Sequence, residues 1–178
     1  ACDMVRKERI FQVIGLLHEA CRDFGIADPR IAVAGLNPHS GENGLFGWEE
    51  EREIIPAVAE ALTSGYNVKG PIPADTMFSK ALGGKYDGCV AMYHDQGHIP
   101  LKLLGFRWNK TLDRLDVKGV NITLGLPVIR VSVDHGTAFD LAGKGLASEE
   151  SMFVSIGYAA KMAGNRLKNN YKKSISGL

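Results

Sequence analysis

The stretch VAMYHDQGHIPLK, residues 90–102, joins the end of an apolar run to a polar turn and then to a helix-forming segment. The run GCVAM, residues 88–92, has the length and the apolar character of a buried parallel strand. His94, Asp95 and Gln96 follow where the strand gives way to the helix. Because ligands bind outside the carboxyl ends of strands in open parallel sheets, this turn is a candidate site. The alternative is a polar loop whose histidine has only a structural role.

The segments before this stretch alternate between helical and strand patterns. Apolar residues at helical spacing predict a helix over residues 4–24, with Asp3 as its cap and Gly25 at its end. The elements expected after it are a strand at 30–34, a helix at 48–64 in which Pro56 marks a kink or a second start, and a strand at 68–70. Residues 71–76 then lead into a helix that runs through about Leu82. This order predicts an α/β fold with a parallel sheet and right-handed crossovers.

The segments after this stretch have a weaker pattern. Residues 106–118 are polar and charged, and we expect them to form a surface excursion. Ser148 is a suitable cap for a last helix, and Glu150 suits its positively charged first turn. The elements expected here are strands at 120–124 and 128–132, a helix from 148 to about 168 and a solvated tail beyond it.

The composition is that of a soluble globular protein, with 23% charged and 45% apolar residues. A formal net charge of +1 gives no reason to expect a nucleic-acid partner, which requires a basic surface. No apolar run has the length of a membrane span, and no signal-peptide pattern opens the chain. Three cysteines without CxxC spacing, Cys2, Cys21 and Cys89, fit a reduced cytoplasm better than a disulfide framework. Because the chain begins ACD and enters a helix almost at once, we expect it to be a fragment of a longer protein.

Two histidines follow two of the expected strands. His39 and His94 would reach the same edge of a parallel sheet, where imidazoles can share a divalent metal such as zinc, cobalt, nickel or iron. Asp75 and Asp95 occupy comparable strand-to-helix turns, and each is a candidate orienting residue, further ligand or proton acceptor. Two histidines are too few for a complete site, because catalytic zinc normally takes three protein ligands. The alternative is a pair of unrelated loop histidines.

A second group of polar residues suits an anionic substrate. Lys102, Asn121 and Arg130 would add two cations and an amide near the same edge, and arginine can bind a carboxylate or phosphate with two hydrogen bonds. Arg130 lies in an otherwise apolar strand, where an unpaired charge is costly. The alternatives are an ordinary surface lysine and a buried salt bridge between Arg130 and Asp134.

The glycine-rich segment at residues 134–145 would let the backbone approach a nucleotide, although it lacks the GxGxxG fingerprint. His135 is a candidate to stack on an adenine or to hydrogen-bond with it. Asp140 is a candidate acceptor for a hydroxyl or for the adenine amino group. The alternative is a structural turn capped by Asp134.

Five motifs occur in order along the chain: GLNPHSGENG (35–44), PADT (73–76), MYHDQG (92–97), VNITLGLP (120–127) and SVDHGTA (132–138). Together they resemble the 4-hydroxythreonine-4-phosphate dehydrogenase family of vitamin B6 biosynthesis. The resemblance covers about residues 30–145 and, more loosely, both flanks. Five motifs in register are far more specific than any one of them.

The resemblance implies a three-layer α/β sandwich of the isocitrate/isopropylmalate dehydrogenase type, incomplete because the chain matches only the C-terminal half of the family. It also implies a homodimer with the active site at its interface. Residues 1–132 would then form the metal- and substrate-binding, dimer-forming domain. Residues 133–178 would carry the cofactor loop and a helix that returns to the missing N-terminal domain.

The resemblance also implies roles for particular residues. Two of the family's three metal-binding histidines match His39 and His94, and the metal is a divalent ion such as Zn, Mg or Co. The family's substrate-contacting lysine, asparagine and arginine match Lys102, Asn121 and Arg130. A segment similar to the adenosine-binding loop of isopropylmalate dehydrogenases implies that NAD or NADP binds at His135, Gly136, Thr137, Ala138 and Asp140.

The implied reaction is the oxidation and decarboxylation of 4-phosphohydroxy-L-threonine to 3-amino-2-oxopropyl phosphate. The metal would lower the pKa of the substrate hydroxyl, Asp75 or Asp95 would take the proton, and hydride would pass to the nicotinamide. Relatives in the family act on D-threonate or D-erythronate 4-phosphate or on dihydrodiols of aromatic acids, and these substrates stay open.

The sequence departs from the family pattern in two places. The third metal histidine and a His-Thr pair that contacts substrate are missing, so the fragment alone is expected to be inactive or to be a non-catalytic remnant. The excursion at residues 107–118 is longer than the family's usual connection and could reshape the substrate end of the site.

Overall fold

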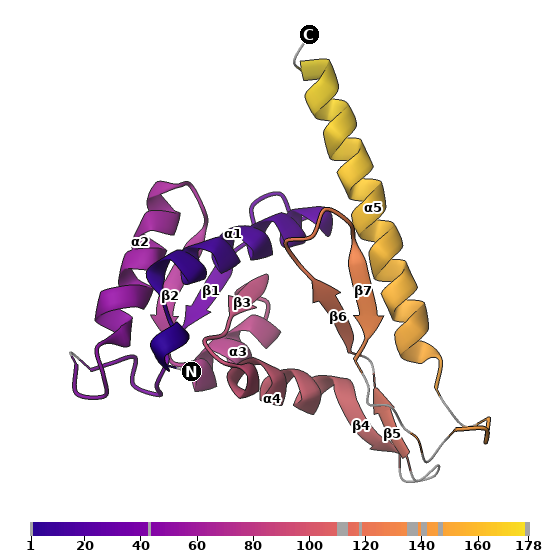
Figure 1. Cartoon of the computed structure of the whole chain (residues 1–178), viewed down its shortest axis with the longest axis horizontal. Coiled ribbons are helices and arrows are strands. Elements are labelled where there is room, and N and C mark those ends of the chain that lie inside the picture. Colours follow the sequence, from indigo (N-terminus) through magenta and orange to yellow (C-terminus); the bar gives the residue numbers. More distant parts are fainter. Residues whose placement is uncertain are drawn as a thin grey trace. The chain divides into compact units, whose positions relative to one another are not determined.

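The computed structural model describes residues 2–42, 44–109, 114–117, 119–134, 139, 142–145 and 148–176. The chain forms two compact units, Ala1–His98 and Ile99–Leu178, which Figure 1 shows in sequence colours. The helix α4 (His94–Gly105) begins in the first unit and ends in the second. The functional division between residues 132 and 133 stays a prediction.

The first unit is built on a parallel sheet of three strands, as the sequence predicts. The strands are β1 (Ile31–Ala34), β2 (Val68–Ile72) and β3 (Gly88–Val90), in the order β2-β1-β3. Ile31 lies opposite Val68 on one side and Gly88 on the other. The central strand β1 is buried at all four positions because both faces of the sheet are covered, which accounts for its uninterrupted apolar sequence.

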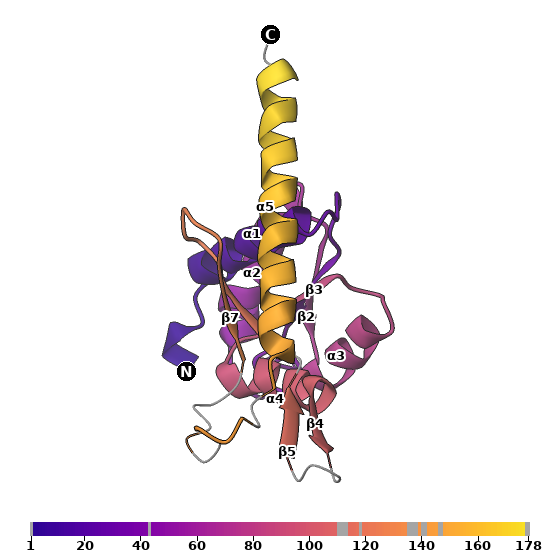
Figure 2. The same ribbon diagram turned by 90° about the vertical axis from the view of Figure 1, so that its right-hand side faces the viewer.

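Helices cover both faces of this sheet. On one face α1 (Lys7–Asp23) and α2 (Ile55–Thr63) pack over a core that includes Ile14, Ile31 and Val33. On the other face Met77 of α3 (Ala74–Leu82) packs over Ala32, Ala34 and Ile72. Alternate residues of β1 thus point into different cores. Figure 2 shows the strands between α1 and α2 on one side and α3 on the other.

The first helix begins later than its sequence pattern predicts. Asp3 lies in a separate short turn, η1 (Cys2–Met4), so the prediction that it caps the helix is wrong. The N-terminus of α1 is satisfied from elsewhere in the chain, because the backbone N–H of Lys7 donates to Oε2 of Glu53 at 2.7 Å. Arg6 donates to the other oxygen of Glu53 at 3.1 Å. The two contacts lower the pKa of Glu53, and the hydrogen bond from Lys7 is the larger cause.

The end of α1 and the start of α2 agree with the sequence. Gly25 follows α1 with a φ of 91°, a left-handed conformation that favours glycine. A π-helical turn, η2 (Glu50–Ile54), precedes α2, and Pro56 stands in the first turn of α2. Pro56 therefore marks a second start, where its missing N–H costs nothing.

The second unit differs from the expected surface excursion. Residues 106–118 include an antiparallel hairpin of β4 (Phe106–Asn109) and β5 (Arg114–Val117). The sequences FRWN and RLDV alternate apolar and polar residues, a period-2 signal that the high charge of the segment conceals.

A second antiparallel pair and the last helix complete this unit. The strands β6 (Val120–Thr123) and β7 (Arg130–Val133) pair with Thr123 opposite Arg130. Helix α5 (Glu150–Ser176) packs against both strands and runs beyond Lys168, so the prediction that the helix ends near that residue is wrong. Oγ of Ser148 accepts the backbone N–H of Glu150 at 3.4 Å, in keeping with the predicted cap.

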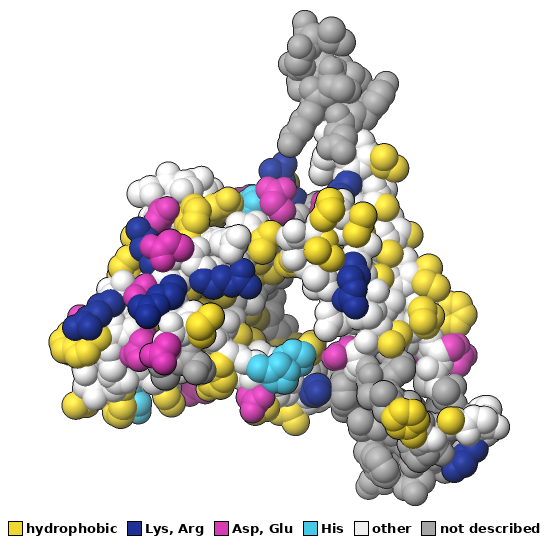
Figure 3. Space-filling view, in the orientation of Figure 1, with side chains coloured by type: hydrophobic (Ala, Val, Ile, Leu, Met, Phe, Trp, Pro, Cys, Tyr) yellow, Lys and Arg dark blue, Asp and Glu magenta, His cyan; other side chains and the backbone are white. Residues whose placement is uncertain are grey.

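The visible surface of the first unit mixes charges of both signs, as the small net charge predicts. Figure 3 shows basic side chains of this unit with acidic side chains beside them on the face in view. Within the described part of the chain, no helix combines the length and the apolar character that a membrane span requires.

Candidate functional site

The carboxyl ends of the three parallel strands lie at one edge of the sheet, and each is followed by polar residues named in the sequence analysis. His39 follows β1, Asp75 lies in the first turn of α3 after β2, and His94 and Asp95 open α4 after β3. The structure thus brings these four residues to the same edge of the first unit. Ligands of open parallel sheets bind at this edge.

A buried carboxylate holds the loop that carries His39. Glu50 is 0% exposed, and its Oε1 accepts the backbone N–H groups of Leu36 at 2.8 Å and of Asn37 at 3.2 Å. The side-chain amide of Asn37 donates to the same oxygen at 2.9 Å. Oδ1 of Asn37 in turn accepts the N–H groups of His39 and Gly41, each at 3.0 Å. A continuous series of hydrogen bonds therefore fixes the backbone of His39 to η2.

The loop wraps closely around this carboxylate, and that closeness explains its glycines. A Cβ added to Gly35 would come within 2.8 Å of Oγ of Ser40 and 3.3 Å of Oε1 of Glu50. Gly41 has a φ of 90°, and a Cβ there would lie 3.3 Å from Glu50. Substitution at either glycine would push the loop away from its anchor.

The imidazole of His39 is held on two sides. Its Nδ1 lies 2.8 Å from Oε1 of Glu42, three residues along the loop. Its ring stacks on Phe46, with the ring centroids 4.8 Å apart and the planes 13° from parallel. The side chain of His39 is 53% exposed, so the site is open to solvent.

The imidazole of His94 is held in the same way by residues of α4. Its Nδ1 lies 2.8 Å from Oδ1 of Asp95. Its ring stacks on His98, one helical turn further on, with the centroids 4.1 Å apart and the planes 10° from parallel. His94 is the first residue of α4, whereas the sequence predicted that it lies in the loop before the helix. The helix therefore begins earlier than predicted.

Gln96 connects the two histidine-bearing segments. Its buried side chain accepts the N–H of Met92 at 2.8 Å and donates to the carbonyl oxygen of Gly35 at 2.8 Å. Met92 precedes His94, and Gly35 begins the loop of His39. One amide therefore links the ends of β3 and β1.

Asp75 and Asp95 differ in what they contact. Oδ1 of Asp75 accepts the N–H of Thr76 at 2.6 Å, a local contact at the start of α3, and the side chain is exposed. Asp95 is engaged with the ring of His94. The difference bears on which carboxylate accepts a proton.

The three predicted substrate-binding residues belong to the second unit or to the end of α4. Lys102 lies in α4, Asn121 in β6 and Arg130 in β7, and all three are exposed. Nη1 of Arg130 donates to Oγ1 of Thr123, its cross-strand neighbour, at 2.7 Å. The prediction that Arg130 is buried in an apolar strand is wrong, because β6 and β7 form a two-stranded ribbon that leaves this position open to solvent.

The predicted cofactor-binding residues, His135, Gly136, Thr137, Ala138 and Asp140, lie outside the described residues. Asp134, which precedes them, has one carboxylate oxygen buried without a hydrogen-bond partner in the described part of the chain. Gly119 packs against it so closely that an added Cβ would lie 2.8 Å from that oxygen. The sequence left open a salt bridge between Arg130 and Asp134. In the structure, Arg130 instead donates a hydrogen bond to Thr123.

The donors at the sheet edge fit a divalent metal in kind but fall short in number. Imidazole nitrogen and carboxylate oxygen are suitable ligands for zinc, cobalt or magnesium. Among the described residues, no group of three or more His, Cys, Asp or Glu side chains could hold a metal ion. His39 and His94 therefore fit a partial donor set.

The cysteines do not contribute to this site. Burial raises the pKa of the Cys89 thiol in β3 to about 11, and burial also raises the pKa of Cys21 in α1. Both thiols are free. They remain protonated at neutral pH and pack as small apolar side chains.

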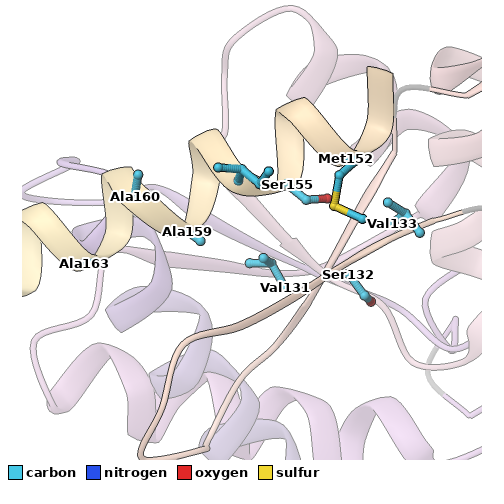
Figure 4. A pocket seen from close by; sticks show the side chains of 9 residues that line it. Val131, Ser132, Val133, Met152, Ser155, Ala159, Ala160 and Ala163 are labelled. Atoms are coloured by element: carbon cyan, nitrogen blue, oxygen red, sulfur yellow. The ribbon is translucent and has the colours of Figure 1, made fainter. Parts of the chain in front are cut away.

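A separate cavity of about 600 Å³ lies in the second unit between β7 and α5. Figure 4 shows Val131, Met152 and Ala159 facing this space. None of the nine residues that line it is titratable, and Oγ of Ser155 is bonded to the carbonyl oxygen of Ser151 within the helix. The cavity has the apolar character of a packing surface and supplies no catalytic group.

A parallel sheet that carries two imidazoles and two carboxylates beyond its carboxyl ends defines an α/β protein with a polar site at that edge. A sequence profile of the family described as "Pyridoxal phosphate biosynthetic protein PdxA" matches residues 1–159, and the chain belongs to this family. The resemblance found in the five motifs is thereby confirmed.

Two relatives illustrate the range of names within the family. The chain is 54% identical over 161 residues to the D-threonate 4-phosphate dehydrogenase of Salmonella typhimurium, covering 90% of this chain and 46% of the relative. It is 52% identical over 163 residues to the 4-hydroxythreonine-4-phosphate dehydrogenase of Beijerinckia indica, covering 90% of this chain and 45% of the relative. The chain thus spans about half the length of the curated relatives it matches.

The fold has a counterpart among solved structures. A crystal structure of 4-hydroxythreonine-4-phosphate dehydrogenase from Klebsiella pneumoniae matches with a TM-score of 0.73 at 53% identity. The match covers 90% of this chain and 46% of that chain.

Four residues at the edge escaped the sequence analysis: Glu42, Phe46, Glu50 and His98. His98 stands four residues after His94, a helical spacing that was present in the sequence. Glu42 lies three residues after His39 in a loop, where this spacing is no signal. Phe46 and Glu50 act across a loop whose path the sequence does not reveal.

Proposed function

We propose that this chain supplies the metal- and substrate-binding half of a PdxA-family dehydrogenase that acts on a four-carbon sugar-acid phosphate such as D-threonate 4-phosphate. The observation that carries the proposal is the position of His39, Asp75, His94 and Asp95, which follow the carboxyl ends of strands in one parallel sheet. The name D-threonate 4-phosphate dehydrogenase recurs among similar relatives. It favours this substrate over 4-phosphohydroxy-L-threonine, the main expectation from the sequence.

The proposal includes the architecture expected from the sequence. Three layers in the first unit are in keeping with a sandwich of the isocitrate/isopropylmalate dehydrogenase type. A homodimer with the active site at its interface would supply groups that this chain lacks. NAD or NADP would bind at residues 135–140.

In this proposal His39 and His94 hold a divalent cation such as Zn, Mg or Co, together with a ligand from outside this chain. When bound, the cation supplies Lewis-acid polarisation of the substrate hydroxyl, and the nicotinamide supplies a hydride acceptor. Lys102, Asn121 and Arg130 bind the phosphate and carboxylate of the substrate.

Asp75 is the proton acceptor in this proposal, and Asp95 orients His94. The assignment follows from their contacts, since Asp95 is engaged with an imidazole whereas Asp75 contacts only its neighbouring backbone among the bonds described above. After hydride loss, the β-keto acid formed from the substrate loses carbon dioxide. The phosphate anchor keeps the remaining three-carbon product in place during this step.

A second candidate substrate is 4-phosphohydroxy-L-threonine, because the Beijerinckia indica relative is named for it at a similar identity. The substrates differ in the group on the carbon next to the carboxylate, a hydroxyl in one and an amine in the other. Direct competition therefore separates the two candidates.

The test measures the formation of NADH by the chain, alone and supplied with the remaining part of a full-length relative. We expect activity only in the complemented protein, with the highest kcat/KM on D-threonate 4-phosphate. Asp75→Asn should lower kcat by about 10²- to 10⁴-fold, the usual contribution of a general base. Glu51→Gln, a change at an exposed carboxylate of η2, is the matched control.

Three results would contradict the proposal. Activity that survives His94→Ala would exclude the metal role of that residue. A higher kcat/KM on 4-phosphohydroxy-L-threonine or on an aromatic dihydrodiol would exclude the substrate. A complemented protein that folds, binds cobalt and turns over none of these substrates would make the chain a non-catalytic remnant.

A further inference from the structure

We propose that Glu42 and Asp95 fix His39 and His94 in the Nδ1-protonated tautomer, so that Nε2 of each ring is the atom presented to the metal. Phe46 and His98 are positioning residues that hold the two ring planes. The inference rests on the proposed function for its purpose, because it concerns how the two imidazoles are prepared to bind a cation.

The tautomer of His39 follows from the chemistry of its neighbour. A carboxylate can only accept hydrogen bonds, and Oε1 of Glu42 lies 2.8 Å from Nδ1. The opposite tautomer would place the lone pair of Nδ1 against the lone pairs of this oxygen. The proton of a neutral His39 therefore resides on Nδ1, and Nε2 carries the lone pair that binds metals.

The orientation of His39 is restricted by the ring beneath it. Phe46 lies nearly parallel to the imidazole, at 13° and 4.8 Å between centroids. A half-turn of the ring about its Cβ–Cγ bond would put Cδ2 in the place of Nδ1 and break the contact with Glu42, and a tilt of the ring would lose the stack. Two contacts of different kinds thus hold the same ring.

The same two contacts recur at His94, although the supporting structure is different. Oδ1 of Asp95 lies 2.8 Å from Nδ1 of His94, and His98 stacks on the ring at 10° and 4.1 Å. At His39 the partners come from a loop, whereas at His94 they come from the first turns of a helix. The repetition in unrelated local structures indicates that the arrangement serves the imidazoles rather than either backbone.

The alternative explanation is that both contacts are ordinary surface ion pairs. The two side chains are 53% and 48% exposed in the first pair and 72% and 73% exposed in the second. Exposed pairs of this kind usually contribute little to stability, so the folded state alone does not require them. Ring orientation and tautomer are the properties that separate the two explanations.

The first experiment identifies the tautomers without any metal. The chain is labelled with ¹⁵N-histidine, and long-range ¹H–¹⁵N correlation spectra are recorded at alkaline pH, where imidazoles are neutral. His39→Gln and His94→Gln assign the two rings. We expect both rings to be protonated at Nδ1, and a ring found in the Nε2-protonated or in a mixed state would overturn the proposal for that histidine.

The second step removes each carboxylate. Glu42→Ala and Asp95→Ala should shift the neighbouring ring towards the mixed state of an unconstrained histidine. Glu42→Gln and Asp95→Asn place an amide there, which can accept from or donate to Nδ1, so these variants should also shift the ring towards the mixed state. Glu51→Ala is the matched control and should leave both rings unchanged. Spectra that do not respond to loss of the carboxylate would overturn its positioning role.

The third step connects the tautomer to the metal. Cobalt(II) is titrated into the complemented protein, and its visible absorption reports binding. The two alanine variants should raise the dissociation constant by about 10- to 100-fold, as expected when the partner of a ligating histidine is lost. Phe46→Leu and His98→Leu should keep the tautomer and raise the dissociation constant by a smaller factor.

The outcomes separate this inference from the function on which it rests. Expected tautomers with unchanged cobalt affinity in the alanine variants would overturn the positioning role and leave the metal site intact. No cobalt binding by the unmodified complemented protein would overturn the proposed metal role itself. A larger loss of affinity in the leucine variants than in the alanine variants would assign the positioning role to the stacked rings instead.

Discussion

Removal of the buried carboxylate beneath the His39 loop should destabilise the first unit strongly. In Glu50→Ala, the N–H groups of Leu36 and Asn37 lose an acceptor at 2.8 Å and 3.2 Å. Each orphaned donor costs about 1–3 kcal/mol when it is buried. Because Leu36 and Asn37 are only half-buried, we expect a total loss of about 2–4 kcal/mol.

Urea-induced unfolding followed by circular dichroism measures this loss, and hydrogen exchange locates it. The amides of Leu36, Asn37, His39 and Gly41 should exchange faster in Glu50→Ala, since all four depend on the carboxylate directly or through Asn37. Amides in β2 should be affected only through global unfolding. Glu50→Gln keeps one carbonyl acceptor and should lose less.

The neighbouring glutamate provides the control. Glu51 lies in the same turn but is exposed, so Glu51→Ala should change the free energy of unfolding by no more than about 0.5 kcal/mol. The reasoning is refuted if Glu50→Ala costs less than about 1 kcal/mol and leaves the four amides as protected as before.

Three further predictions concern other parts of the first unit. Gln96→Ala removes two hydrogen bonds to backbone groups and should cost about 2–3 kcal/mol in urea unfolding; a loss equal to that of an exposed control would contradict it. Hydrogen bonds from Arg30 hold the pKa of Asp87 below its ordinary value of 3.8, so their stabilisation is present above that pH and is lost as the pH falls towards the lower folded pKa. Asp87→Asn should therefore flatten the dependence of the urea midpoint on pH below about 4, and an unchanged acid slope would exclude the pair as its source. Because the pKa of Cys89 is about 11, only about one thiol in 1,000 is ionised at pH 8, and iodoacetamide should modify it slowly in the folded protein and rapidly in urea.

The parallel sheet was predictable because its signals are local. The run Ile31–Ala34 is apolar throughout, and the helices before and after this strand end at glycines in the left-handed conformation, Gly25 and Gly65. Strand order then brings His39, Asp75 and His94 to one edge without knowledge of any side-chain contact. The positions of these residues therefore followed from topology alone.

The errors share a different physical origin. Asp3 has the right chemistry for a cap, but Glu53, far along the chain, accepts the first N–H of α1 instead. Arg130 lies in an apolar sequence, yet its strand belongs to a two-stranded ribbon with an open face. Burial and capping depend on what packs against an element, and the pattern within the element does not contain that information.

The two buried residues that hold the site, Glu50 and Gln96, could not be predicted because their contacts are also distant in the sequence. Glu50 acts on a loop 13 and 14 residues before it, and Gln96 bonds to a carbonyl 61 residues before it. Both are polar residues that a one-dimensional pattern assigns to the surface. Only the folded chain distinguishes them from their exposed neighbours.

The amide of Gln96 has one more consequence, for how the family can diversify. Its oxygen and its nitrogen both hydrogen-bond to main-chain groups. The amide therefore sets the spacing of the two histidine-bearing segments, whatever side chains surround them. Under the proposed function, substitutions on the outer rim would alter which acid phosphate fits, while the spacing of the two backbone segments is preserved. A fixed backbone spacing with a variable rim would account for relatives that are more than 50% identical to this chain and yet are named for different substrates.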